Sequence, residues 1–202
     1  MRVVVGSLVL VAIVVLGGAP AAAQGVSWGV KGGVNFATLN VDEEPTPEFQ
    51  YRIGVIAGGF FTWPMGSHLD VQPEALFSQQ GATFDAFGTG STIKTDYLVA
   101  PILVRYKVHS SGRGLVFFAG PSLGFKLSAN ATADFGDGSV SDDISDEIES
   151  FDFGLAFGAG WEIGRLSIDG RYTWGLSRIN TDEADPQKTM HRVIAILAGV
   201  RF

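Results

Sequence analysis

Few residues in this sequence are suited to acid–base or nucleophilic chemistry. The 202 residues include three histidines and no cysteine, which excludes a thiolate nucleophile and a disulfide framework. Only His191 could meet a serine and an aspartate, Ser177 and Asp182, if the elements that carry them ended at one rim. The sequence contains no nucleophile-elbow motif. We therefore predict that the chain has no catalytic residue and is not an enzyme.

Carboxylates gather in two segments. Residues 129–150 contain no Lys or Arg and carry seven acids, which are Asp134, Asp137, Asp142, Asp143, Asp146, Glu147 and Glu149. Carboxylate oxygens suit divalent cations, but the spacing lacks the Asp-x-Asp-x-Asp-Gly series and the twelfth-position Glu of an EF-hand. A second acidic stretch, residues 42–48, contains two prolines. Solvated acidic loops are the preferred interpretation, and we expect neither a metal site nor a cofactor.

Composition and the first residues narrow the class further. The formal net charge is −7, which disfavours nucleic acid as a partner. The chain opens on Arg2, an uncharged apolar run over residues 3–16 and the small residues Ala21–Ala23. About 14 apolar residues are too few to span a bilayer, so the pattern predicts a signal peptide, residues 1–23, that is cleaved. One domain, residues 24–202, would remain.

The body of the chain alternates with a period of two. In the first run Val26, Trp28, Val30, Val34 and Phe36 oppose small and polar residues, as in a strand with two unlike faces. About eight such runs follow one another, each roughly 11–13 residues long, whereas strands of soluble proteins usually have about 5–6. A tilted strand needs about 9–11 residues to cross a bilayer. The runs therefore have the length of membrane-spanning strands.

The connections between these runs alternate in length. Short Gly-bearing turns fall at residues 64–67, 109–114 and 164–165, and longer segments at residues 40–50, 81–93, 129–150 and 178–189. This layout predicts an all-β fold, an eight-stranded antiparallel up-and-down transmembrane β-barrel with short periplasmic turns and long extracellular loops. A soluble, lipocalin-like barrel is the alternative that alternation alone does not exclude.

Residue types on the two faces favour the membrane barrel. The apolar face is almost free of charge, and the other is rich in glycine, serine and single charges. Aromatic residues of the apolar face fall near the strand ends, where membrane barrels carry two interfacial girdles. The girdle residues we predict are Trp28, Phe36, Tyr51, Trp63, Tyr106, Phe117, Phe153, Trp161 and Trp174.

The inward face would enclose charges of both signs. The predicted lumen charge network consists of Lys31, Arg52, Asp70, Glu74, Arg105, Lys107, Lys126, Asp152, Glu162, Asp169, Arg171 and Arg201. One interpretation is a charged path for ions. The preferred one is a plug, because eight strands leave an interior that side chains just fill.

The last strand and four internal runs carry a family resemblance. Apolar residues alternate up to Phe202 at the C-terminus, which is similar to the signal read by the barrel-assembly machinery, so Phe202 is the expected assembly signal. Residues 30–36, 97–104, 119–124 and 172–176 resemble the "porin family" outer-membrane β-barrel domain, the PorT-like relatives of OmpA and OmpX. The resemblance covers nearly the whole chain after residue 23. It implies a fold and a location but no shared catalytic set.

Together these features predict a small barrel in the cell outer membrane, exported through the periplasm. Its lumen would be plugged by side chains, and its role would be structural or interactive, through acidic extracellular loops. A narrow pore or transport accessory is the alternative, and a lipid enzyme acting at the rim comes after it. The expected partners are outer-membrane lipid, the barrel-assembly machinery during insertion and an extracellular ligand of the loops. We expect a monomer and no nucleic acid.

Overall fold

The computed structural model describes residues 25–41, 50–86, 89–109, 113–134, 139–144, 149–177 and 189–202. The predicted signal peptide, residues 1–23, lies outside these residues. The strands within them are β1 (Ser27–Val41), β2 (Gln50–Pro64), β3 (Leu69–Ala86), β4 (Thr89–Lys107), β5 (Arg113–Asp134), β6 (Ser139–Asp143), β7 (Phe151–Ile163), β8 (Leu166–Gly175) and β9 (Thr189–Arg201). No helix in the described part of the chain is long and apolar enough to cross a membrane.

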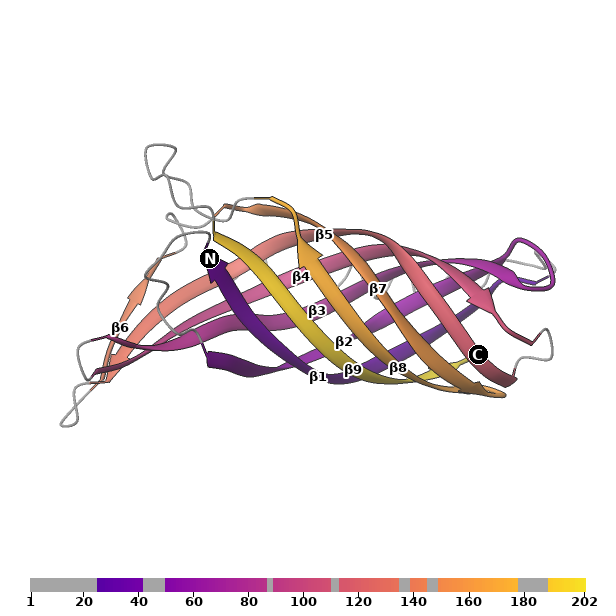
Figure 1. Ribbon diagram of the computed structural model, residues 1–202, viewed down its shortest axis with the longest axis horizontal. Coiled ribbons are helices and arrows are strands. Elements are labelled where there is room, and N and C mark those ends of the chain that lie inside the picture. The colour runs from indigo at the N-terminus through magenta and orange to yellow at the C-terminus, as the bar shows by residue number, and fades with distance from the viewer. Residues whose placement is uncertain are drawn as a thin grey trace, which may run out of the picture.

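Eight long strands close into one antiparallel barrel. The order around the sheet is β4-β3-β2-β1-β9-β8-β7-β5, and a further pairing of β4 with β5 closes the circle (Figure 1). First and last strands are neighbours, with Val34 opposite Ile196. The short β6 pairs only with the far end of β5. The predicted eight-stranded barrel is thus confirmed, and closure leaves every spanning strand paired on both sides, as hydrocarbon requires.

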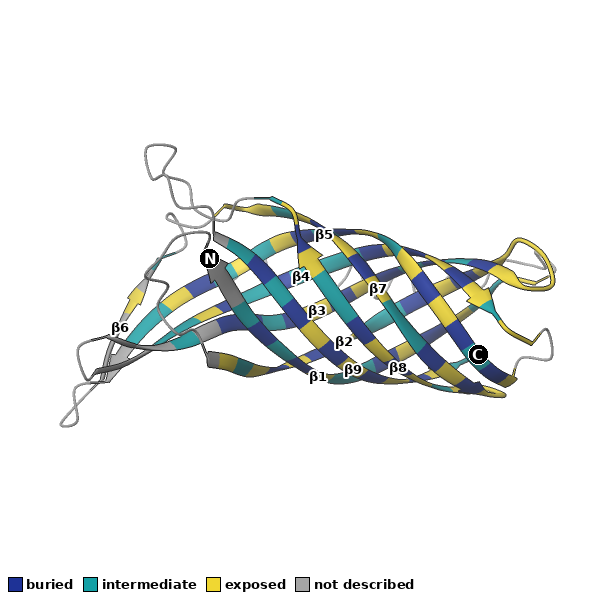
Figure 2. Cartoon of the chain, viewed as in Figure 1, coloured by how far each residue is buried: buried dark blue, intermediate teal, exposed yellow. Residues whose placement is uncertain are grey.

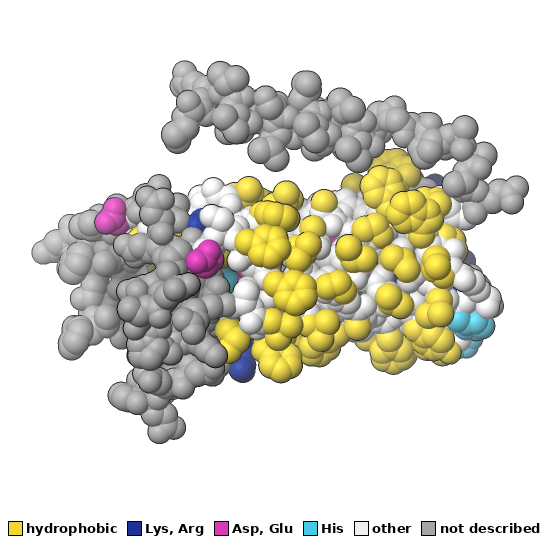
Figure 3. Space-filling model, turned by 90° about the horizontal axis from the view of Figure 1, so that it is seen from above, with side chains coloured by type: hydrophobic (Ala, Val, Ile, Leu, Met, Phe, Trp, Pro, Cys, Tyr) yellow, Lys and Arg dark blue, Asp and Glu magenta, His cyan; other side chains and the backbone are white. Residues whose placement is uncertain are grey.

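The period of two separates the faces of every long strand. On β2, Ile53 is 67% exposed and Ile56 is 5% exposed (Figure 2). The exposed positions carry the large apolar side chains, which cover in yellow the face of the barrel seen in Figure 3. A wall of exposed Trp, Phe, Ile and Leu is stable only where hydrocarbon surrounds it, because such a wall facing water would far exceed the apolar patches of soluble proteins.

The two ends of the barrel differ. At the turn end, short connections join β2 to β3, β4 to β5 and β7 to β8, and the chain ends there at Phe202 (Figure 1). The opposite end, which we call the loop end, carries the longer connections from β1 to β2 and from β8 to β9, together with β6 and the short connection from β3 to β4. In outer-membrane barrels the turn end faces the periplasm.

The loops are shorter than the sequence suggested. Residues 81–93 were expected to form a loop, but β3 continues to Ala86 and pairs there with Thr89 of β4. Residues 129–150 were also expected to form a loop, but β5 continues to Asp134 and forms a hairpin with β6. Both expectations were wrong because Thr, Ser and Ala on the two faces gave no contrast between a solvated strand and a loop. The strands β3 to β6 consequently extend the sheet beyond the barrel wall.

Candidate functional site

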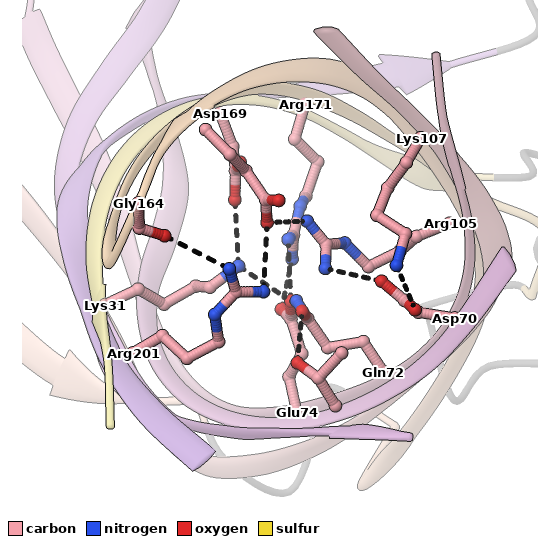
Figure 4. Close-up of polar contacts among 12 residues, drawn as sticks. Lys31, Asp70, Gln72, Glu74, Arg105, Lys107, Gly164, Asp169, Arg171 and Arg201 are labelled. Atoms are coloured by element: carbon pink, nitrogen blue, oxygen red, sulfur yellow. Dashed lines mark hydrogen bonds and ion pairs between the residues drawn. The ribbon is translucent and has the colours of Figure 1, made fainter. Parts of the chain in front are cut away.

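The centre of the lumen is an ion cluster built on Glu74. Its carboxylate on β3 accepts hydrogen bonds from Lys31 Nζ of β1 at 2.8 Å and from Arg171 Nη1 of β8 at 2.7 Å. Gln72 Nε2 donates to the same carboxylate at 2.7 Å. Lys31 Nζ also contacts Asp169 Oδ2 at 2.8 Å. The side chain of Glu74 is fully buried, so strands far apart in sequence are joined across the lumen by one carboxylate (Figure 4).

A second ion cluster lies nearer the turn end. Arg105 of β4 contacts Glu162 of β7 at 2.5 Å and Asp70 of β3 at 3.6 Å. Lys107 contacts Asp70 at 2.8 Å, and Arg201 contacts Glu162 at 3.6 Å. The two clusters together hold five cations and four carboxylates. This near balance lets the charges stay in an enclosed space, where an unpaired ion would cost several kcal/mol.

Aromatic and aliphatic side chains fill the space around the ions. Lys31 Nζ lies 4.9 Å from the ring centre of Phe60, and Arg171 lies 5.4 Å from that of Phe118. Both rings fit against glycines: a Cβ on Gly29 would come within 2.4 Å of Phe60, and one on Gly158 within 2.9 Å of Phe118. The remaining volume is taken by half-buried Val99 and by the buried side chains of Leu76, Leu103, Val116 and Leu197.

Two small cavities remain in the described lumen. The one toward the loop end has about 30 Å³ for the centres of water-sized molecules, room for about two waters. The one toward the turn end has about 10 Å³. Arg171 lines the first and Lys31 the second, so the Glu74 cluster stands between them. Side chains thus interrupt the lumen at its centre.

Three predicted network residues lie outside both clusters. Arg52 donates through Nη1 to the carbonyl of Gln80, near the loop end. Asp152 accepts a hydrogen bond from Ser177 Oγ at 2.5 Å. Lys126 is half-buried on β5, where its backbone N–H donates to the Ser150 carbonyl at 3.0 Å. The structure therefore brings nine of the twelve predicted charges together and leaves these three toward the loop end.

His191 and Ser177, two of the three residues that the sequence suggested as a catalytic set, have other partners. His191 is buried, and its Nε2 lies 3.3 Å from the hydroxyl of Tyr97, whose ring meets the imidazole edge-on. Ser177 bonds Asp152, while Asp182 lies outside the described residues. Tyr97 was missed from the sequence, although its place on the inward face, in line with Leu103 and Arg105, was the available signal. Gln72 was also missed as a hydrogen-bond donor to Glu74, although its place on the inward face was the available signal.

The predicted girdle residues all lie on the outer wall. Eight of the nine are exposed and Phe36 is half-buried. At the seam between β1 and β9, the rings of Trp28 and Phe202 lie 4.7 Å apart, and the Phe202 N–H donates to the Trp28 carbonyl at 2.7 Å. Through this ring contact and hydrogen bond, Phe202 of the last strand packs against the first strand.

The described residues include no group of three or more His, Asp or Glu side chains placed to hold a metal ion. Residues 135–138 and 145–148, which include Asp137, Asp146 and Glu147 of the acidic segment, lie outside the described residues. Asp142 and Glu149, which are described, are exposed.

Comparison with known proteins points to one family. A sequence model of the outer membrane protein beta-barrel domain matches residues 22–180. No curated protein matches the sequence. Among solved structures, Neisserial surface protein A (NspA) is similar with a TM-score of 0.50 at 13% identity, and the match covers 89% of this chain and 100% of that one.

Two further solved structures match at lower scores. Ail, the attachment invasion locus protein of Yersinia pestis, solved with the heparin analogue sucrose octasulfate, has a TM-score of 0.44 at 15% identity, covering 88% of this chain and 99% of that one. OprG from Pseudomonas aeruginosa has a TM-score of 0.44 at 14% identity, covering 87% and 95%. At these identities the likeness is one of fold.

Proposed function

Because the chain belongs to the outer membrane protein beta-barrel domain family and is an outer-membrane barrel, we propose that it is a sealed membrane anchor that holds an acidic surface outside the cell. The supporting observation is the Glu74 cluster, which crosses the lumen between two small cavities. A barrel closed in this way supports interaction at its ends rather than passage through its centre.

The extended sheet supports the interaction role. Strands β3, β4 and β5 have 18, 19 and 22 residues, about twice the length that a tilted strand needs to cross a bilayer. The surplus lies at the loop end together with β6, and residues 129–150 there carry seven acids and no base. An acidic surface at this end suits a cationic ligand better than an anionic one.

Planar-bilayer recording tests the seal. We expect the purified wild-type chain to give no stable conductance steps. Replacing Lys31, Glu74 and Arg171 together by serine removes the central cluster and is expected to produce a steady small leak, with heat-modifiable gel mobility showing that the variant is folded. Reproducible porin-size steps in the wild type would favour the alternative function, a narrow pore or transport accessory.

Catalysis at the rim is the remaining alternative, and we propose that the chain has none. Ser177 is bonded to Asp152 and His191 contacts Tyr97, so neither is directed toward the other by these contacts. Lipid mass spectrometry of cells with the wild type and with His191→Ala is expected to give identical profiles. A lipid species that disappears in the variant would establish an enzyme.

A further inference from the structure

The charge of the turn end is opposite to that of the loop end. The connections at residues 64–69, 108–114 and 163–166 contain no Asp or Glu, but contain Arg113 and Arg165. Both arginines are exposed, and no charged partner for either side chain occurs among the described residues. The carboxylates nearest in sequence, Asp70 and Glu162, are buried in the lumen and already paired. Apart from the terminal carboxylate of Phe202, the described residues of this end carry positive charge that no acid compensates.

The two arginines lie at the turn end, Arg113 on the outer wall and Arg165 at the rim, where it also lines the turn-end cavity. Arg113 at the start of β5 pairs with Ile163 at the end of β7, and Arg165 follows two residues later in the turn to β8. Arg113 has the same parity as the outward residues of β5, so its side chain leaves the barrel on the lipid side. Ile163 is 58% exposed between them. We call Arg113 and Arg165 the arginine pair.

An exposed apolar surface lies directly above the arginine pair. Trp161, Leu166 and Ile168 are each more than half exposed, and Trp161 is opposite Ile168 in the sheet. Trp161 belongs to the girdle that marks the edge of the hydrocarbon. With a rise of about 3.3 Å per residue and a tilt of about 40°, Ile163 and Arg113 lie about 5 Å beyond it, at the depth of lipid phosphates.

From this arrangement we propose that the sector formed by the arginine pair and Trp161 binds an anionic phospholipid of the periplasmic leaflet. The arginines take the phosphate, for which the planar guanidinium is suited. The acyl chains lie along Trp161 and Ile168, while Leu166, which pairs with Ile163, lies nearer the phosphate. A free phosphate would use only the first half of this site, whereas the juxtaposed charge and exposed apolar wall fit a molecule that has both parts. The proposal is independent of whether the lumen conducts.

Brominated lipids provide the test, because bromine quenches nearby tryptophans. The chain is reconstituted in phosphatidylcholine vesicles that contain either brominated phosphatidylglycerol or brominated phosphatidylcholine. We expect the anionic lipid to be favoured at the wall by about fivefold or more, the factor that one basic residue near an anionic membrane contributes. Soluble glycerol phosphate is not expected to displace it.

Two variants and one control complete the design. Arg113→Gln/Arg165→Gln is expected to abolish the preference, and Arg113→Lys/Arg165→Lys to keep most of it. Lys94→Gln, which removes an exposed charge at the loop end, is expected to leave the preference unchanged. Equal quenching by both lipids in the wild type, or a preference that survives the double glutamine variant, would overturn the proposal.

Discussion

Glu74 is the residue on which most of the central cluster depends. Its carboxylate is the partner of Lys31, Arg171 and Gln72. Glu74→Gln leaves Arg171 without its ion-pair partner, and removing one member of a buried pair costs about 3–5 kcal/mol. Urea unfolding followed by tryptophan fluorescence is expected to show a loss of that size. Glu149→Gln, at an exposed position, is the control and should change stability by less than about 0.5 kcal/mol.

Gly158 and Gly170 offer a matched test of how closely the lumen is packed. They lie on neighbouring strands, but a Cβ on Gly158 would stand 2.1 Å from the Gly170 carbonyl oxygen, while a Cβ on Gly170 would have its nearest neighbour at 3.9 Å. Gly158→Ala is expected to cost about 1–3 kcal/mol through overpacking. Gly170→Ala is expected to be close to neutral in the same unfolding assay. Equal effects would show that the inward glycines are not required by packing.

At the scale of single elements, the last strand controls closure. Phe202→Ala removes the ring contact with Trp28 and the predicted assembly signal together. We expect a smaller fraction of heat-modifiable, membrane-inserted protein. Phe151→Ala is the control, because it removes a similar aromatic pair, Phe125–Phe151 at 5.3 Å, from the loop end. If both variants assembled equally well, the role of Phe202 as a signal would be refuted.

The β5–β6 hairpin should be separable from the barrel. The pairing of β5 with β7 spans Arg113 to Phe125, below the hairpin. Replacing residues 131–142 by Asn-Gly, a favoured hairpin turn, keeps this pairing and removes only the pairing of residues 131–134 with residues 90–93 of β4, beyond the barrel wall. The unfolding midpoint is therefore expected to change little. Binding of polylysine to vesicles that contain the protein should fall. The double variant Asp142→Asn/Asp143→Asn keeps the hairpin and should also weaken the binding of polylysine. If neither the deletion nor the double variant changed polylysine binding, the acidic hairpin would be excluded as the contact surface.

What the sequence could predict differs between strands and contacts. Alternation determined which face of β1, β2 and β7 meets lipid, because one face was uniformly apolar. Alternation predicted that Lys31 and Glu74 point into the lumen, but it did not predict their contact. The two residues are 43 positions apart in the sequence, and their depth and angular position in the barrel depend on the register between strands. Parity likewise placed Tyr97 on the inner face but did not give its contact with His191. The extension of β3 to β5 lacked a signal because most residues there, on both faces, are polar or small.

At the scale of the whole molecule, charge is distributed along the barrel axis. Acidic residues concentrate in the loop-end segments, paired ions occupy the lumen, and unpaired arginines lie at the turn end. Family membership establishes the location, and the two proposals assign a cationic ligand to one end and an anionic lipid to the other.

The most direct test of this account is spin labelling of β7, because the chain has no cysteine and each single-cysteine variant is therefore specific. Leu155 and Phe157 are 39% and 42% exposed, whereas Ala156 is 1% exposed. In vesicles, labels at residues 155 and 157 are predicted to be accessible to dissolved oxygen and shielded from an aqueous nickel chelate, and the label at residue 156 to be shielded from both. Strong nickel accessibility at residues 155 and 157, or no alternation, would contradict a wall in contact with hydrocarbon.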